Sequence, residues 1–224
     1  MKILAFDTSS TACSIALLAD EKITFTHDNV PMQQARLILP NIDALLSASH
    51  LKVTDLDAIA FGVGPGSFTG VRIATSVAQG LAFATHIPLI PISSLAAVAQ
   101  SAYQDLGWTR LLVAMDARIG EVYWAAYVVA GQGVVELLGS EAISSPEAVW
   151  LPNDPGWYGV GTGWGEYREK LPFEMIALDA TRLPMATAIL SLARVKWLHS
   201  EWISARDALP VYLRDKVAVK KDTS

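Results

Sequence analysis

The chain has 224 residues, a length that suits one large domain or two of about 110 residues each. Hydrophobic residues make up 52% and charged residues 17%, so the chain can bury a large core. A net charge of −5 argues against a protein that holds nucleic acid by itself, because neutralising phosphates needs a basic surface. The single cysteine, Cys13, excludes an intrachain disulfide and a multi-thiolate metal site.

The chain shows no sign of a membrane segment or a secretion signal. No apolar run is long enough to span a bilayer, and Asp7 interrupts the apolar start at once, which a signal peptide would not tolerate. We therefore expect a soluble, cytoplasmic protein. Cys13 lies in a strand pattern and is expected to be a small buried hydrophobe. A basic cluster near the C-terminus is expected to be a solvated tail rather than a binding patch; it contains Arg214, Lys216, Lys220 and Lys221.

The first element is a predicted β-hairpin, with strands at 3–6 and 12–18 and Asp7 at its first bend. The same strand, Asp and strand pattern returns at 111–129, with Asp116 in the place of Asp7. This repeat predicts two similar lobes that face one another. We place their boundary so that residues 1–106 form the N-terminal lobe and residues 107–224 the C-terminal lobe.

A helix is predicted from Pro31 to Ser49, because a proline suits the first helical turn. Pro40 falls inside this helix and should kink it. Apolar residues recur at helical spacing; they are Leu37, Ile38, Ile42, Leu45 and Leu46.

The most distinctive motif is a strand at 58–61 that runs into a turn containing Gly62, Gly64 and Gly66. Ser67 or Thr69 can cap the helix that follows. Such a turn can present backbone N–H groups to an anion or a phosphate, or its glycines can simply allow tight packing. It is neither a Walker loop nor a dinucleotide fingerprint.

The helix predicted at 67–86 is unusual because Arg72 is its only charged residue before His86. A helix at the surface of a protein normally has a charged face opposite its apolar stripe. This helix is therefore either sandwiched in a core or partly covered by another chain.

The remaining elements complete an α/β chain. Helices are predicted at 94–103 and 186–203, and 145–172 is expected to be mostly loop. A weaker copy of the glycine turn appears at 159–164.

Little in the sequence points to catalysis. Asp7 and Asp116 could hold a metal-bound nucleotide between the lobes, or each could accept hydrogen bonds at its own turn. The four histidines have no metal-ligand spacing, and Ser67 is not in a nucleophile elbow. Arg118 and Glu121 are expected to form an ion pair within the lobe.

Four motifs together resemble the TsaB (YeaZ) family, in its order and from one end of the chain to the other. They are Ile-Leu-Ala-Phe-Asp-Thr-Ser (3–9), Gly-Val-Gly-Pro-Gly-Ser-Phe-Thr-Gly-Val-Arg-Ile (62–73), Met-Asp-Ala-Arg-Ile-Gly-Glu-Val-Tyr (115–123) and Pro-Val-Tyr-Leu-Arg-Asp-Lys-Val-Ala (210–218). The resemblance implies a two-lobed actin-like, Hsp70-like and sugar-kinase-like (ribonuclease H-like) fold, in a degenerate member of that ATPase superfold.

The resemblance also implies a function. Members are non-catalytic subunits of the machinery that forms N6-threonylcarbamoyladenosine in tRNAs that read codons beginning with A. The catalytic paralogue TsaD would be the heterodimer partner, and the small ATPase TsaE would complete the assembly. The chain alone would form a homodimer, would meet tRNA only through the complex, and would require no cofactor or metal, although ATP or ADP could bind at the partner interface.

The resemblance gives two sets of residues a role. A vestigial nucleotide or phosphate loop would contain Asp7, Thr8, Gly64, Gly66, Ser67 and Thr69. The interface with a paralogue, or with a second copy, would contain Leu37, Ile38, Ile42, Leu45, Arg72, Val77 and Leu81. The alternative function is that of a small ATP-dependent kinase or a glycoprotease-like peptidase of the same superfold, for which the chain lacks an evident catalytic set.

Overall fold

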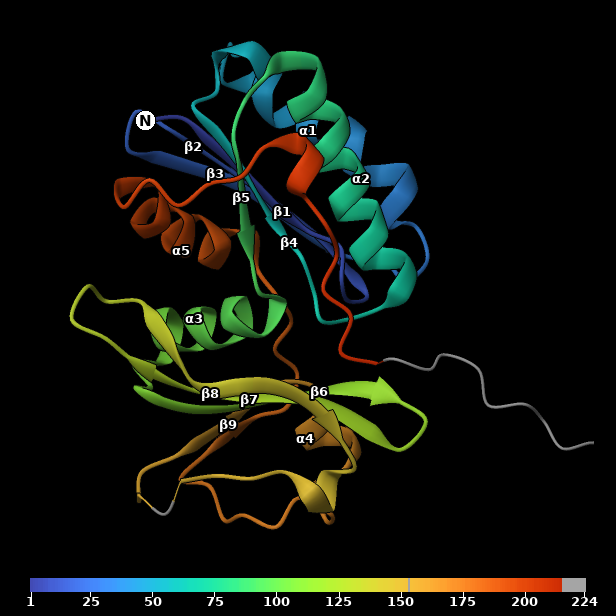
Figure 1. Cartoon of the computed structure of the whole chain (residues 1–224), viewed down its shortest axis with the longest axis vertical. Helices are drawn as coiled ribbons and strands as arrows, with labels where there is room; N and C mark the ends of the chain where they lie inside the picture. Colours follow the sequence, from blue (N-terminus) through green and yellow to red (C-terminus); the bar gives the residue numbers. More distant parts are fainter. Residues whose placement is uncertain (153, 215–224) are drawn as a thin grey trace, which may run out of the picture.

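The computed structural model describes residues 1–152 and 154–214, and it contains two five-stranded sheets (Figure 1). The first sheet has the order β3-β2-β1-β4-β5. Its strands are β1 (Ile3–Asp7), β2 (Ala12–Ala19), β3 (Lys22–Asn29), β4 (Ala58–Gly62) and β5 (Leu89–Ile92). The second sheet has the order β8-β7-β6-β9-β10. Its strands are β6 (Arg110–Arg118), β7 (Glu121–Val129), β8 (Val135–Ser144), β9 (Tyr158–Val160) and β10 (Leu178–Asp179).

The two sheets have the same topology. In each, the first three strands form an antiparallel meander, and the fourth and fifth strands then continue from the first strand in parallel. Asp7 ends β1 and Asp116 lies near the end of β6, so the repeat in the sequence is confirmed as a structural repeat. This duplicated sheet is the architecture of the two-lobed actin-like fold expected above.

The five α-helices of the described residues form layers around the sheets (Figure 1). They are α1 (Gln34–Ala48), α2 (Phe68–Thr85), α3 (Ser94–Leu106), α4 (Gly163–Glu166) and α5 (Ala186–Leu198). Three short 3₁₀ turns lie at Val53–Asp55, Pro146–Ala148 and Ala205–Asp207. The helices α1 and α2 cover one face of the first sheet, where Phe6, Ile15 and Phe61 lie in their core.

The helices α3 and α5 lie between the two sheets and share one core with both of them. They are also exchanged between the lobes. The helix α3 follows β5 but packs on β6 to β9, whereas α5 follows β10 and packs on β1 to β5. A division at residues 106 and 107 thus separates the strands of the two sheets but not the helices that pack on them. The proposed domain boundary stays a prediction.

Several local expectations were wrong. The first helix begins at Gln34, so Pro31 lies in the turn before it and not in its first turn, although Pro40 does lie inside the helix. The strands β3 and β8 were not predicted; both are edge strands with largely exposed side chains. The segment 145–172 is mostly loop, as expected, and is interrupted only by a short 3₁₀ turn, β9 and α4. The last helix ends at Leu198, five residues before the expected end.

The chain's C-terminal segment returns to the first lobe and then approaches the second. Val211 N–H donates to the Val63 carbonyl at 2.8 Å, and Gln79 Nε2 donates to the Ala208 carbonyl at 2.7 Å. Arg214 then pairs with Glu121 on the hairpin between β6 and β7. We call residues 208–214 the C-terminal strap. Of the basic cluster, Lys216, Lys220 and Lys221 lie outside the described residues.

Candidate functional site

Asp7, the first residue of the expected nucleotide loop, is enclosed by its own lobe and is only 1% exposed. Its Oδ1 accepts hydrogen bonds from the backbone N–H and the hydroxyl of Ser9, both at 2.7 Å. Its Oδ2 accepts from the hydroxyl of Ser94, at the start of α3, at 2.8 Å. Burial raises the pKa of the Asp7 carboxyl, although these three hydrogen bonds act in the opposite direction.

This environment fits a carboxyl that accepts hydrogen bonds at its turn and not one that holds a hydrated metal. A chelating carboxylate must be accessible to the hydrated cation, and the Asp7 side chain is enclosed by its own lobe and accepts three hydrogen bonds from it. The repeat-related Asp116 behaves similarly, since its Oδ1 accepts from the Arg118 N–H at 2.8 Å. Its Oδ2 pairs with Arg118 at 3.0 Å. The expected pair of Arg118 with Glu121 is therefore wrong, because Glu121 pairs with Arg214 instead.

The glycine turn after β4 is packed directly against the first hairpin. A Cβ atom on Gly66 would lie 2.5 Å from the Ser9 carbonyl oxygen, and the Ser67 N–H donates to that same oxygen at 2.7 Å. Gly64 has a φ of +99°, which glycine adopts without strain. The turn is thus filled by the chain's own backbone, as in the packing interpretation, and does not form an open cradle for a phosphate.

The other members of the expected loop have separate roles. Thr8 is buried, and its hydroxyl donates to the Gly70 carbonyl at 2.7 Å. Ser67 is the N-cap of α2 and its Oγ accepts from the Gly70 N–H at 3.4 Å, as predicted for one of the two cap candidates. Thr69 is exposed on the first turn of α2. None of these side chains converges with the others on a shared space.

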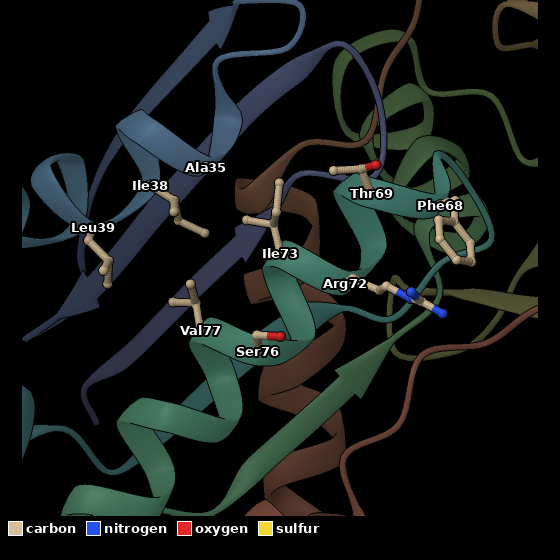
Figure 2. A pocket seen from close by; sticks show the side chains of 9 residues that line it. All are labelled: Ala35, Ile38, Leu39, Phe68, Thr69, Arg72, Ile73, Ser76 and Val77. Carbon is tan, nitrogen blue, oxygen red and sulfur yellow. The ribbon is translucent and has the colours of Figure 1, made fainter.

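The exposed site in this lobe is a groove between α1 and α2, with a volume of about 480 Å³ (Figure 2). We call it the helix groove. It is lined by Ala35, Ile38, Leu39, Phe68, Thr69, Arg72, Ile73, Ser76 and Val77. Leu39 is 52% and Phe68 45% exposed, so large apolar side chains face solvent along the groove. A concentrated apolar surface of this kind is typical of a protein-binding site.

The expected interface residues divide into three groups. Ile38, Arg72 and Val77 line the helix groove, although Ile38 is only 1% exposed and also packs in the core under the helices. Leu37 and Leu81 are partly buried against the core under the helices and do not line the groove. Ile42 and Leu45 are 3% and 9% exposed, lie in the core under the helices and do not line the groove. Helical spacing identified the apolar residues of α1 but could not show which of them the sheet would cover.

Arg72 forms a small cluster with two aromatic residues at one end of the groove. Its guanidinium carbon lies 3.7 Å from the centre of the Phe68 ring, and its Nε donates to the Tyr212 hydroxyl at 2.7 Å. Neither Phe68 nor Tyr212 was predicted to be a site residue. The signal that could have found them was the Tyr-Leu-Arg motif at 212–214, but nothing in the sequence places that motif beside α2.

Within residues 1–152 and 154–214, no group of three or more His, Cys, Asp or Glu side chains could hold a metal ion. In the same residues, the helices are too short or too polar to cross a membrane.

Comparisons with known proteins agree with the motifs. A family model described as "TsaD: tRNA N6-adenosine threonylcarbamoyltransferase" matches residues 30–206. The chain is 39% identical over 226 residues to the tRNA threonylcarbamoyladenosine biosynthesis protein TsaB of Escherichia coli K12, covering 99% of this chain and 98% of that protein. It is 40% identical over 232 residues to the TsaB of Haemophilus influenzae, covering 99% and 97%.

A solved structure shows the same fold. YeaZ from Pseudomonas aeruginosa superposes with a TM-score of 0.92 at 47% identity, covering 95% of this chain and 99% of that one. These three relatives are matched over nearly the whole length of both chains. The chain therefore belongs to the TsaB (YeaZ) family.

Proposed function

We propose that the chain is a non-catalytic subunit of the machinery that forms N6-threonylcarbamoyladenosine in tRNAs that read codons beginning with A. It activates the catalytic paralogue TsaD by binding it through the helix groove. The observation that carries this proposal is the groove itself, where apolar side chains of α1 and α2 face solvent and Arg72 is the only charge. The names of the TsaB relatives support the pathway.

The first hairpin supports a non-catalytic role. Phosphoryl transfer requires charged groups arranged around the phosphates and a bound metal. Asp7 was the main candidate for such a group, and its carboxyl is buried and accepts three hydrogen bonds from its own lobe. This geometry argues against the alternative of an ATP-dependent kinase, and the helix-cap contact of Ser67 favours a structural role over that of a peptidase nucleophile.

The rest of the assembly follows from the same proposal. The free chain is a cytoplasmic homodimer that uses the same groove, and it exchanges into a heterodimer with the paralogue. TsaE joins this heterodimer, ATP or ADP binds at the partner interface and not in the chain alone, and tRNA is reached only through the complex. The net charge of −5 is consistent with this indirect contact with tRNA.

Light scattering after gel filtration tests the proposal, on the chain alone and on the chain mixed with its paralogue. We expect a homodimer that converts to a one-to-one heterodimer. Val77→Asp and Leu39→Asp place a charge in the groove and should abolish the heterodimer. Leu39 is 52% exposed, so the second variant leaves the core of the lobe intact.

Leu198→Asp is the matched control, because Leu198 is 76% exposed at the end of α5, on the opposite face of the first sheet from α1 and α2. It should bind the paralogue normally. If both groove variants fold and still form the heterodimer, the groove is not the binding surface. If the wild-type chain ignores the paralogue, the scaffold role itself is wrong, and nucleotide turnover should be measured next.

A further inference from the structure

The helix groove has one charged side chain in an otherwise neutral lining. Arg72 is the only charged residue of α2, and the other eight lining residues carry no charge. Arg72 lies beside Phe68 at the N-terminal end of α2, whereas Ile38, Ile73 and Val77 line the apolar middle of the groove (Figure 2). The groove thus combines an apolar floor with a single cation at one end.

The Arg72 side chain is held in a fixed orientation. The guanidinium carbon of Arg72 lies 3.7 Å from the centre of the Phe68 ring. The Tyr212 hydroxyl accepts a hydrogen bond from the Nε of Arg72 at 2.7 Å. Tyr212 is itself positioned by the C-terminal strap, through the hydrogen bond of Val211 to Val63. An exposed arginine normally samples many rotamers and loses that freedom on binding. Here the strap and the aromatic ring have already restricted it.

The outer nitrogens of Arg72 are not used inside the lobe. Within residues 1–152 and 154–214, its Nη groups make no hydrogen bond and no ion pair. Two other arginines that are held in place differ in this respect. Arg182 pairs with Asp105 and Asp179, and Arg214 pairs with Glu121. Arg72 is oriented like a paired arginine, but no carboxylate among the described residues pairs with it.

We propose that the partner supplies this counter-ion, as an aspartate or glutamate that meets the Nη groups of Arg72 when apolar side chains fill the groove. This inference rests on the proposed function and specifies the chemistry of the partner surface. Closing the groove removes Arg72 from water, and a buried cation without a partner is costly. A carboxylate can accept two parallel hydrogen bonds from a guanidinium fork, which also fixes the register of the complex.

The affinity of the paralogue for three variants, measured by titration calorimetry, tests the inference. Arg72→Met keeps most of the apolar stem and removes the charge, and it should weaken binding about thirtyfold. Arg72→Lys keeps the charge but loses the fork and should give an intermediate loss. Tyr212→Phe removes only the hydroxyl that orients Arg72, so its loss should be smaller than that of Arg72→Met. Thermal unfolding of each variant shows whether the lobe is intact.

A charge exchange gives the decisive result. Arg72→Glu should abolish binding, and replacing one acidic residue on the docking surface of the paralogue with arginine should restore it. Wild-type affinity of Arg72→Met, together with loss of binding in Val77→Asp, would overturn the carboxylate contact and leave the proposed function standing. Normal binding in both variants would overturn both. If Arg72→Met weakens only self-association, the inference about the paralogue is also wrong.

Discussion

Thr8 and Gly70 fasten the first hairpin to the start of α2. The Thr8 hydroxyl donates to the Gly70 carbonyl at 2.7 Å, and a Cβ atom on Gly70 would lie 1.9 Å from the Thr8 carbonyl oxygen. The backbones therefore approach so closely that no other residue fits at position 70. This contact sets where α2 begins relative to the sheet, and so it also positions Phe68 and Arg72 at the end of the groove.

Gly70→Ala should destabilise the protein by about 3 kcal/mol or more, because the new methyl group would overlap backbone atoms that cannot move aside. Gly80→Ala is the matched control in the same helix. Nothing lies within 4 Å of a Cβ atom on Gly80, so this change should stabilise the protein by about 0.5 to 1 kcal/mol through helix propensity. Urea unfolding of both variants measures the difference. Equal effects would show that the contact with Thr8 is not tight.

Local features of the fold could be predicted from the sequence. The strand, turn and helix around Gly62 to Phe83 were predicted correctly, because apolar runs and glycine turns are local signals. The repeat of Asp7 at Asp116 also correctly predicted two lobes. The edge strands β3 and β8 were missed, since their exposed faces dilute the apolar pattern on which strand prediction depends.

The candidate site was harder to predict. Of the residues expected at a partner interface, Ile38, Arg72 and Val77 line the helix groove, whereas Ile42 lies in the core under the helices. The interface itself stays a prediction. The contact of Arg72 with Tyr212 joins residues 140 positions apart, and no periodicity in a single sequence encodes such a pairing. The sequence also could not show that the glycine turn packs closely against the hairpin. An anion site and a packing turn were therefore equally good interpretations of the motif.

Asp7→Asn should change how stability depends on pH. Burial raises the pKa of the Asp7 carboxyl in the folded state, so the folded chain binds this proton more tightly than the unfolded chain does. The free energy of unfolding then falls as the pH rises from the unfolded pKa, about 3.9, through the folded pKa, and it stays lower above that point. An asparagine side chain does not titrate, so the stability of the variant lacks this contribution to the pH dependence. The stability of the variant relative to wild type should therefore increase as the pH rises above about 4.

Urea unfolding across this pH range measures the effect. Ser94→Ala provides a second test, because it removes a hydrogen bond that favours the ionised form of Asp7. The decline of stability with rising pH should be steeper or extend to higher pH in that variant. A wild-type protein that gains stability relative to Asp7→Asn as the pH rises would show that the hydrogen bonds of Asp7 outweigh its burial.

Cys13 should be chemically inert in the folded protein. The residue is completely buried in β2, and burial, together with the charges of Asp28 and Asp7, raises the pKa of its thiol to about 11. The thiolate is the reactive form, so Ellman's reagent should not react with the native chain at neutral pH. In denaturant it should detect one thiol per chain. Rapid reaction of the native protein would mean that β2 opens readily to solvent.

The two ion pairs around the β6–β7 hairpin should differ in strength. Arg214 has a side chain 17% exposed, and it also donates to the Arg118 carbonyl at 3.2 Å while it pairs with Glu121. Arg118 is 79% exposed where it pairs with Asp116. A double-mutant cycle on Arg214 and Glu121 should give a coupling free energy of about 1 kcal/mol, and the cycle on Arg118 and Asp116 one between zero and about 0.5 kcal/mol.

Urea unfolding of the alanine variants measures both cycles. A larger coupling at Arg214 would mean that the C-terminal strap contributes to stability at the point where it reaches the second lobe. The same strap carries Tyr212, which holds Arg72 at the groove. Arg214→Ala should therefore also weaken binding of the paralogue, by less than Tyr212→Phe does, since the contacts of Val211 and Gln79 still hold the strap on the first lobe. Equal coupling in the two cycles would contradict this role of the strap.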